Sequence, residues 1–217
     1  MVRVLQPAPQ LPYSRNTFDD TAAAVLAAIG PITVLDVGCG AGKYGRIARA
    51  VLADTVLTGY EPERSYIARF GLRKLYDEVR VQLIQEAMRS PSEHFDMCIF
   101  GDSLEHLPKS IGNDVVHYFL YRTSFILIVA PLEYLQDNGE QERFEAHLSS
   151  WSPLEFSLHT DVAYLSTGNA WLGLLRGFEC SRAKFRSVIS QLRGHRLTYV
   201  KNITDQLRAP PTPQSRR

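Results

Sequence analysis

The chain has 217 residues, of which 45% are hydrophobic and 22% are charged, and its formal net charge is +1, values typical of one globular domain with a substantial core. It contains no run of about 18 apolar residues and no apolar segment of secretory-signal length near its N-terminus, so we expect neither a membrane span nor secretion. Its three cysteines lie far apart and form neither a metal motif nor a disulfide framework, which favours a cytoplasmic location.

The charge is distributed unevenly along the chain. Residues 176–217 contain ten basic and two acidic residues, a net charge of +8, whereas residues 1–175 carry −7. A basic end of this kind could bind phosphates of nucleic acid or an anionic lipid, or it could dock on the acidic body or on a second subunit. A solvated or self-docked tail is the simplest interpretation.

The predicted elements begin with an Ala-rich helix over Thr21–Ile29, which follows a capping-box-like Thr17-Phe18-Asp19-Asp20 and is stopped by Gly30-Pro31. Strands and helices then alternate, which predicts a mostly parallel sheet covered on both faces. The expected strands are 32–37, 55–60, 79–84, 96–101 and 125–131, and the expected helices are 43–53, 64–76, a short or degenerate one near 86–88, and 111–122.

The pattern changes in the last third of the chain. Ser152-Pro153-Leu154-Glu155 is a helix-start signature, and Val162–Ser166 and Ala170–Arg176 flank the hairpin-type turn Thr167-Gly168-Asn169. An apolar helical stripe follows from Cys180 to Leu192. Leu197, Val200, Ile203 and Leu207 could form a second stripe, and the proline-containing residues 208–217 are predicted to be disordered.

A glycine-rich turn follows the first predicted strand. The run Asp36-Val37-Gly38-Cys39-Gly40-Ala41-Gly42 leads into a helix near Lys43. This strand–turn–helix geometry brings the backbone against a nucleotide-like ligand, because glycine tolerates positive φ and has no Cβ to strike the ligand. The Gly-x-Gly-x-Gly spacing, with an acid two residues before the first glycine, is not the dinucleotide-binding pattern.

Three further segments extend this motif. Val56–Pro62 is a short strand that ends in Glu61, 19 residues after Gly42, where a βαβ unit places a carboxylate for two ribose hydroxyls. That spacing also suits a nicotinamide enzyme. Phe95–Leu107 is a strand that ends in Asp102-Ser103-Leu104-Glu105-His106, and Phe125–Pro131 is another strand.

Together these four segments resemble the class I S-adenosylmethionine-dependent methyltransferases over roughly residues 30–175. The resemblance implies a doubly wound, mostly parallel seven-stranded sheet with a terminal antiparallel hairpin. It also implies S-adenosyl-L-methionine as the cofactor. A nicotinamide-binding domain would not be expected to end in such a hairpin.

The resemblance also implies which residues meet the cofactor. Asp36 would hold its amino group, directly or through water, and Glu61 would accept hydrogen bonds from its ribose. Where relatives commonly read Gly-Asp-Ile, this chain has Gln82-Leu83-Ile84, so the usual carboxylate for the adenine amino group is missing and Gln85 or Glu86 would supply that contact. The full expected set is Asp36, Gly38, Cys39, Gly40, Gly42, Tyr60, Glu61, Pro62, Leu83, Ile84, Asp102 and Ser103.

His106 and His147 are the candidate catalytic residues, because a free imidazole titrates near neutral pH and suits activation of a hydroxyl. The alternative is that both are structural, with Glu105-His106 ordering its loop. The segment Leu132–Trp151 is expected to form the acceptor wall, and Tyr13-Ser14-Arg15 to close over the methionine end. Glu105, His106, Glu133 and His147 could in principle bind a divalent ion, but they show no metal-binding spacing, so no metal site is predicted.

The sequence thus predicts methyl transfer to a small-molecule or sugar-containing acceptor, with oxygen as the expected acceptor atom. Two alternatives stay open: an RNA methyltransferase that uses the basic C-terminal segment, and a non-catalytic interaction subunit. The expected organisation is a cap segment and helix (1–30), a cofactor-binding core (31–177) and a basic amphipathic segment with its tail (178–217), through which a homodimer could form.

Overall fold

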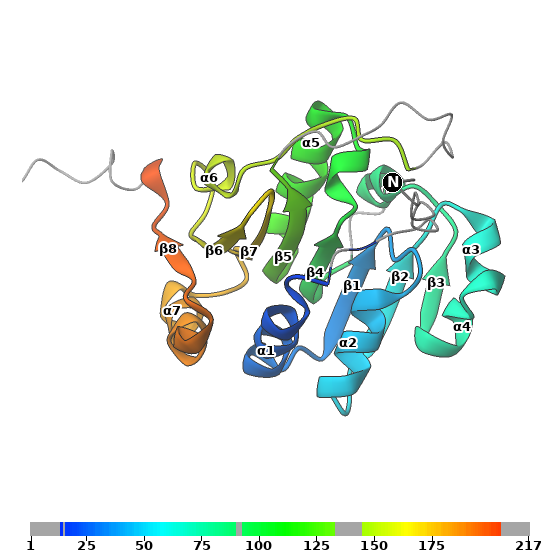
Figure 1. Cartoon of the computed structure of the whole chain (residues 1–217), viewed down its shortest axis with the longest axis horizontal. Coiled ribbons are helices and arrows are strands. Elements are labelled where there is room, and N and C mark those ends of the chain that lie inside the picture. The colour runs from blue at the N-terminus through cyan, green and yellow to red at the C-terminus, as the bar shows by residue number, and fades with distance from the viewer. Residues whose placement is uncertain (1–13, 15, 90–92, 133–144, 205–217) are drawn as a thin grey trace, which may run out of the picture.

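The computed structural model describes residues 14, 16–89, 93–132 and 145–204, which build one eight-stranded sheet with helices on both faces (Figure 1). The order of the strands is β3-β2-β1-β4-β5-β7-β6-β8. Their bounds are β1 (Thr33–Val37), β2 (Val56–Tyr60), β3 (Glu78–Arg80), β4 (Phe95–Gly101), β5 (Thr123–Pro131), β6 (Val162–Thr167), β7 (Ala170–Arg176) and β8 (Thr198–Val200).

The sheet confirms the predicted doubly wound topology. The pairs β3–β2, β2–β1, β1–β4 and β4–β5 are parallel, whereas β7 is antiparallel to both β5 and β6. The chain builds β2 and β3 on one side of β1 and then crosses to β4 on the other side. Ligands of such sheets bind beyond the carboxyl ends of the strands at this switch point.

One strand was not predicted. β8 pairs antiparallel with β6, so the sheet has eight strands rather than seven, and residues 198–200 lie in a strand rather than in a second amphipathic helix. Without β8, the edge of β6 would leave backbone N–H and C=O groups unpaired. The hydrogen bonds that β8 forms with this edge stabilise a strand more than a few apolar residues at helical spacing stabilise a helix. Leu207 of that predicted stripe and the tail 208–217 lie outside the described residues.

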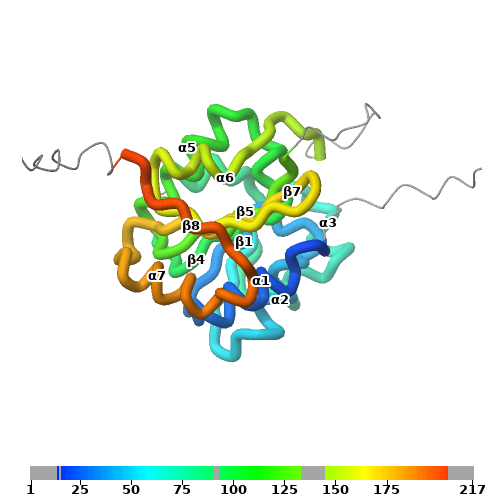
Figure 2. Tube along the Cα trace, turned by 60° about the vertical axis from the view of Figure 1, so that its left-hand side comes forward, coloured from blue at the N-terminus to red at the C-terminus, as the bar shows by residue number. Residues whose placement is uncertain are grey.

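The helices lie in two layers. Figure 2 shows α5 and α6 on one side of the sheet and α1, α2 and α7 on the other. The α-helices are α1 (Asp19–Ile29), α2 (Lys43–Val51), α3 (Arg64–Arg69), α4 (Leu72–Leu75), α5 (Lys109–Leu120), α6 (Pro153–Phe156) and α7 (Arg182–Gln191), and the 3₁₀ helices are η1 (Ile84–Arg89), η2 (Leu104–His106) and η3 (Arg193–His195).

Each face of the sheet has its own apolar core, because successive side chains of a strand point to opposite faces. On β5, Phe125, Leu127 and Val129 pack with α1, α2 and α7, whereas Ile126 and Ile128 pack with α5 and with Trp151. The interior strands therefore read as continuous apolar runs.

Two predicted helix boundaries are wrong. The helix expected over 64–76 is two helices, because Gly71 adopts a φ of +63° between α3 and α4. Helix α1 begins after Phe18, whose side chain is 1% exposed, and no side-chain cap from Thr17 forms; burial of the phenylalanine positions this end instead. The capping box of Ser152 and Glu155 at α6 is confirmed.

Part of the basic C-terminal segment folds onto the body. Phe185, Val188 and Leu192 bury in the core shared with α1, and the fully buried Asp161 carboxylate receives the guanidinium groups of Arg176 and Arg182 at 3.2 and 2.9 Å. These contacts fit the self-docked interpretation for this part of the segment.

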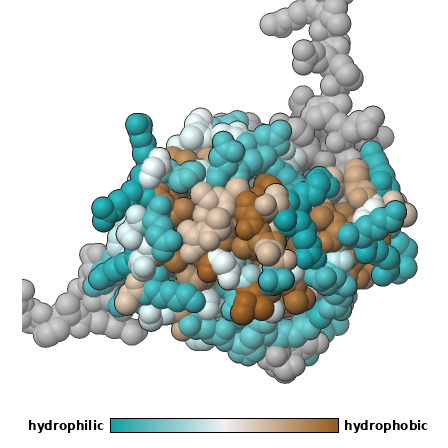
Figure 3. All heavy atoms as spheres, turned by 90° about the horizontal axis from the view of Figure 1, so that it is seen from below, coloured by the Kyte–Doolittle hydropathy of each residue, from teal (hydrophilic) through white to brown (hydrophobic). Residues whose placement is uncertain are grey.

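The side of the molecule that carries α1, α2 and α7 shows apolar residues between hydrophilic ones (Figure 3). The exposed large apolar side chains of the described residues include Ile32, Val51 and Leu154, and also the contacting pair Tyr121 and Phe178, whose ring centroids lie 4.7 Å apart. Among the described residues, no helix is both long enough and apolar enough to cross a bilayer.

Candidate ligand-binding site

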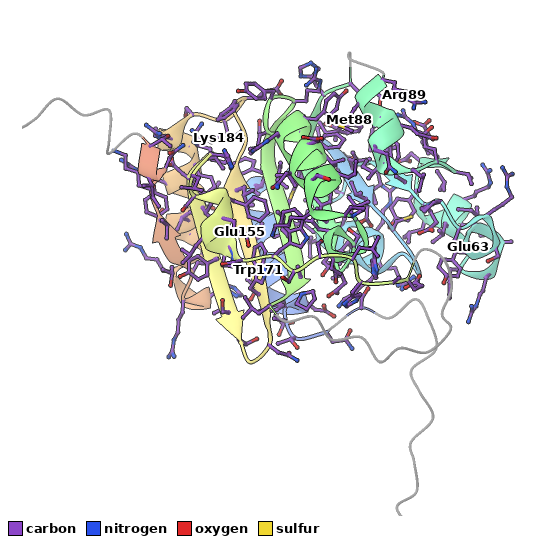
Figure 4. The ribbon with its side chains drawn as sticks, turned by 90° about the horizontal axis from the view of Figure 1, so that it is seen from above. Glu63, Met88, Arg89, Glu155, Trp171 and Lys184 are labelled. Atoms are coloured by element: carbon purple, nitrogen blue, oxygen red, sulfur yellow. The ribbon has the colours of Figure 1, made fainter. Side chains whose placement is uncertain are left out.

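A pocket of about 250 Å³ opens at the carboxyl ends of β1, β2 and β4, where the strand order reverses. Figure 4 views the molecule from the side of α5 and α6, with Glu63 marking the side of α3 and Glu155 and Trp171 marking the side of α6 and β7. The described residues that line the pocket are Ser14, Val37, Gly38, Gly40, Tyr60, Glu61, Pro62, Gln82, Leu83, Ile84, Gln85, Gly101, Asp102, Ser103, His106, Leu107, Pro108, Glu145 and Leu148.

The glycine-rich loop forms the floor of this pocket. Gly38 and Gly40 have φ values of +66° and +50°, a region that side chains rarely adopt. A Cβ on Gly38 would also lie 2.9 Å from Cβ of Ser103, at the end of β4. The loop is tied to β2, because the backbone N–H groups of Gly38 and Cys39 both donate to the carbonyl of Tyr60, at 2.8 and 3.0 Å. Glycine is therefore required where two strand ends come together.

The Glu61 carboxylate joins the loop to the end of β2. Its Oε2 accepts a hydrogen bond from the Gly40 N–H at 2.7 Å, and its Oε1 accepts one from the Glu63 N–H at 2.8 Å. The residue is only 4% exposed, and burial raises the pKa of its carboxyl from 4.5 to about 7, although both N–H groups act in the opposite direction. The side chain is thus held in one orientation at the pocket, with further lone pairs on both oxygens.

Asp36 is not among the pocket-lining residues. Its carboxyl is buried beneath the loop, where its Oδ2 accepts a hydrogen bond from the Tyr76 hydroxyl at 2.5 Å, and burial raises its pKa to about 6. The sequence predicted that Asp36 holds a ligand amino group directly or through water. A buried carboxyl outside the pocket lining favours the contact through water, and this role stays a prediction. Cys39 and Gly42 also lie outside the pocket lining; Gly42, with a φ of +80°, is the N-cap of α2.

The segment after β3 forms one wall. Leu83 and Ile84 line the pocket as expected, together with Gln82 and Gln85. The side-chain oxygen of Gln85 is buried and accepts no hydrogen bond within the described structure, whereas Glu86 is exposed and does not line the pocket. A buried acceptor without a donor is costly, and a ligand N–H would satisfy it.

The end of β4 forms the opposite wall. Asp102 has a φ of +51°, an uncommon value for a residue other than glycine, and such local strain is often found at functional sites. The Ser103 hydroxyl is buried and makes no hydrogen bond to the described residues. Both polar side chains and His106 therefore border one pocket.

The two candidate catalytic histidines lie side by side. His106 lines the pocket and His147 does not, but their rings are in edge-to-face contact with centroids 5.0 Å apart. The Nδ1 atom of His106 lies 3.2 Å from the carbonyl oxygen of Ala146. Because a carbonyl can only accept, Nδ1 carries the proton, and the lone pair of the neutral ring is on Nε2.

The charge of the lining is one-sided. Three carboxylate residues, Glu61, Asp102 and Glu145, line the pocket, and among the described residues of the lining there is no lysine or arginine. Glu145 is held from α3, because the Tyr66 hydroxyl donates to its Oε1 at 3.1 Å. The pocket therefore favours a ligand with positive charge and disfavours phosphate groups.

Part of this lining comes from the segment that the sequence proposed as acceptor wall. Glu145 and Leu148 belong to that segment, and the chain crossing brings them to the end of β2, whereas Pro108 was not predicted to line the site. Ser14 lines the pocket as the region before α1 was expected to do. Its neighbours Tyr13 and Arg15, and Glu133 of the acceptor wall, lie outside the described residues.

No protein-family model and no curated protein matches the sequence. Solved structures are similar in fold. DhpI in complex with SAH is 17% identical over 74% of this chain and 85% of that one, with a TM-score of 0.57. The N-terminal domain of EvdMO1 in the presence of SAH and D-fucose is 13% identical over 76% of this chain and 84% of that one, with a TM-score of 0.56. An O-methyltransferase family protein from Burkholderia thailandensis is also similar, with 13% identity and a TM-score of 0.55. The match covers 73% of this chain but only 55% of the length of that protein. At these identities the likeness concerns the fold, and the chain has the fold of the class I S-adenosylmethionine-dependent methyltransferases.

Proposed function

We propose that this chain is an S-adenosylmethionine-dependent methyltransferase that acts on a small molecule, with oxygen as the methyl acceptor. The observation that carries the proposal is the Glu61 carboxylate, which the Gly40 and Glu63 N–H groups hold at the switch point of the sheet. A fixed, buried carboxylate at the end of the second strand suits a pair of ribose hydroxyls.

The charge of the pocket favours this cofactor over a dinucleotide. S-adenosylmethionine carries a sulfonium and an ammonium group against one carboxylate, whereas nicotinamide dinucleotides carry a diphosphate. Glu61, Asp102 and Glu145 would attract the first and repel the second. The same acidic lining offers no phosphate contacts for an RNA strand among the described residues, which supports a small-molecule acceptor.

The residues at the pocket suggest how the cofactor lies. The ribose would sit at Glu61, and the adenine ring would pack on Leu83 and Ile84. The buried Gln85 oxygen would accept a hydrogen bond from the adenine amino group, in place of the carboxylate that relatives carry. The methionine portion would then extend over Gly38 toward Ser103, since both residues line the pocket.

The reaction requires an acceptor oxygen in line with the methyl carbon and the sulfur. The bound cofactor would supply the methyl group: the oxygen would form a bond to the methyl carbon while the carbon–sulfur bond breaks and its electron pair stays on the sulfur, which would leave S-adenosylhomocysteine. The acceptor hydroxyl would lose its proton, and the Nε2 lone pair of His106, which lines the pocket, would accept it. The main contribution of the protein is alignment of the two reactants.

The acceptor would enter between the end of β4 and residues 145–148. Glu145 and Leu148 would give this wall one carboxylate and one apolar surface, which suits a hydroxylated, uncharged or cationic molecule. A sugar-containing acceptor fits this chemistry, and the similar EvdMO1 domain was solved in the presence of D-fucose.

Calorimetric titration of the whole chain with S-adenosylmethionine, S-adenosylhomocysteine and NAD⁺ tests the proposal. We expect binding of both sulfur nucleosides, with S-adenosylmethionine at least as tight because of its extra positive charge, and no binding of NAD⁺. Binding of NAD⁺ alone, or of none of the three, would overturn it. Incubation with hydroxylated sugars and S-adenosylmethionine, followed by mass spectrometry for an added methyl group, then tests the acceptor class.

A further inference from the structure

Three side chains beside the pocket form a cluster, although their positions in the sequence show no metal-binding spacing. Glu105 and His106 belong to η2, and His147 comes from a segment about forty residues further along the chain. One ligand atom from each, a carboxylate oxygen and two imidazole nitrogens, lies within 4.8 Å of the other two. Glu105 is 2% exposed, and both histidines are partly buried.

The backbone holds this cluster together independently of the three side chains. The N–H groups of Leu148 and Ser149 both donate to the carbonyl oxygen of Glu105, at 2.7 and 3.1 Å. The Ser149 hydroxyl donates to the carbonyl of Leu107 at 2.8 Å, and the Trp151 indole N–H donates to the Ser149 hydroxyl at 2.7 Å. The two segments are thus joined on both sides of the cluster, and a change in one cluster side chain leaves these bonds in place.

The orientation of His106 is that of a metal ligand. Its Nδ1–H donates to the Ala146 carbonyl, which fixes the ring and leaves the Nε2 lone pair as the group available for coordination. Histidines that bind metals commonly donate their second ring N–H to a backbone carbonyl or a carboxylate in this way.

We propose that Glu105, His106 and His147 bind one divalent transition-metal ion at the wall of the cofactor pocket. Two imidazoles and one carboxylate are the ligand set that suits Zn²⁺, Co²⁺ or Fe²⁺ better than Mg²⁺ or Ca²⁺, which prefer oxygen. With metal–ligand distances of about 2.1 Å, two ligand atoms on one ion are at most about 4.2 Å apart, so movements of less than about 1 Å would close the site.

The ion would have a role in the chemistry of the pocket, a step that rests on the proposed function. Three protein ligands leave a coordination position open, and His106 belongs to the pocket lining, so an acceptor hydroxyl could occupy that position. Coordination lowers the pKa of such a hydroxyl, and its proton then leaves to solvent before the oxygen attacks the methyl carbon. The Nε2 lone pair of His106 binds either the ion or a proton, so in the ion-bound state the ion replaces the imidazole as the activating group.

Titration of the chelator-treated chain with Co²⁺, followed by visible absorption, and with Zn²⁺ in a calorimeter tests the site without any acceptor. We expect one ion per chain. We also expect His147→Ala and Glu105→Gln to weaken binding by more than the roughly 10–100-fold that loss of an outer-shell partner causes. The matched control is His117→Ala, because His117 and His159 form a second histidine pair, with ring centroids 4.2 Å apart, away from the cluster.

Three results would overturn the proposal: no binding by the unaltered chain, one-to-one binding that survives His147→Ala, or binding that His117→Ala abolishes. S-adenosylhomocysteine binding by His147→Ala is measured in parallel, and we expect it to be unchanged, because His147 does not line the pocket. A chain that binds the ion but no sulfur nucleoside would refute the proposed function and leave the metal site standing.

Discussion

Replacing Glu61 with glutamine removes one of the two acceptor oxygens on which the glycine loop depends. In the folded chain these oxygens accept from the N–H groups of Gly40 and Glu63. Glutamine offers one oxygen and one NH₂ group, so one backbone N–H would face another donor. The same change removes the negative charge proposed to bind the ribose hydroxyls.

The expected size of the effect follows from these contacts. A hydrogen bond to a charged group contributes about 1.5–3 kcal/mol, and two ribose hydroxyls would engage the carboxylate. The neutral glutamine relieves the desolvation of a buried charge, which offsets part of the loss. We therefore expect cofactor binding to weaken by about 2–4 kcal/mol, or roughly 30- to 700-fold in Kd.

The pH dependence of binding adds a second readout. Because burial raises the pKa of Glu61 to about 7, a growing share of the free protein carries the neutral acid as the pH falls below 7. Affinity of the unaltered chain for S-adenosylhomocysteine should thus rise between pH 6 and 8 and then level off, whereas that of Glu61→Gln should lack this component.

Calorimetric titration of both proteins at several pH values measures both effects. Glu63→Gln is the control, because that change keeps the backbone N–H that binds Glu61 and alters only the side chain that caps α3. An affinity of Glu61→Gln within about threefold of the unaltered chain, or the same pH profile in both, would refute the reasoning.

Three further predictions concern the same pocket. Gly38→Ala, which requires a Cβ 2.9 Å from that of Ser103 at a φ of +66°, should lower the free energy of unfolding by roughly 1–2 kcal/mol or more in urea titrations; an unchanged midpoint would contradict this. Gln85→Leu should weaken S-adenosylhomocysteine binding about fivefold, the effect of one hydrogen bond of about 1 kcal/mol, without lowering the melting temperature of the free chain; equal affinity would exclude the adenine contact. Asp36, with its pKa raised from 3.8 to about 6, keeps a proton in the folded chain that the unfolded chain loses. The free energy of unfolding should therefore fall by up to about 3 kcal/mol between pH 4 and 6, and Asp36→Asn should flatten that slope; a parallel slope would refute the assignment.

Local patterns were enough for the scaffold of the site. The alternation of strand and helix signals predicted the doubly wound sheet, because each pattern depends on residues that are near one another in the chain. The glycines of the loop were predicted for the same reason, since positive φ and close approach are properties of single positions. The acid at the end of β2 followed from the length of one βαβ unit.

Contacts between segments that are distant in the chain could not be predicted from local sequence patterns. Asp36 is typical of a cofactor-loop acid by sequence, yet the Tyr76 hydroxyl, forty residues further along the chain, occupies its carboxylate. The choice between Gln85 and Glu86 depends on which side chain the short η1 helix turns toward the pocket, and no periodicity of the sequence specified that rotation.

The sequence by itself determined the class of sheet, the glycine loop and the carboxylate at the end of β2, because turn geometry and side-chain periodicity are short-range properties. Only the tertiary structure decided that β8 joins the sheet and that Glu145 faces Glu61 across the pocket. Only the tertiary structure shows that His147 lies beside Glu105 and His106. That contact depends on the packing of several elements, which together position the segment 145–151 at the end of β4.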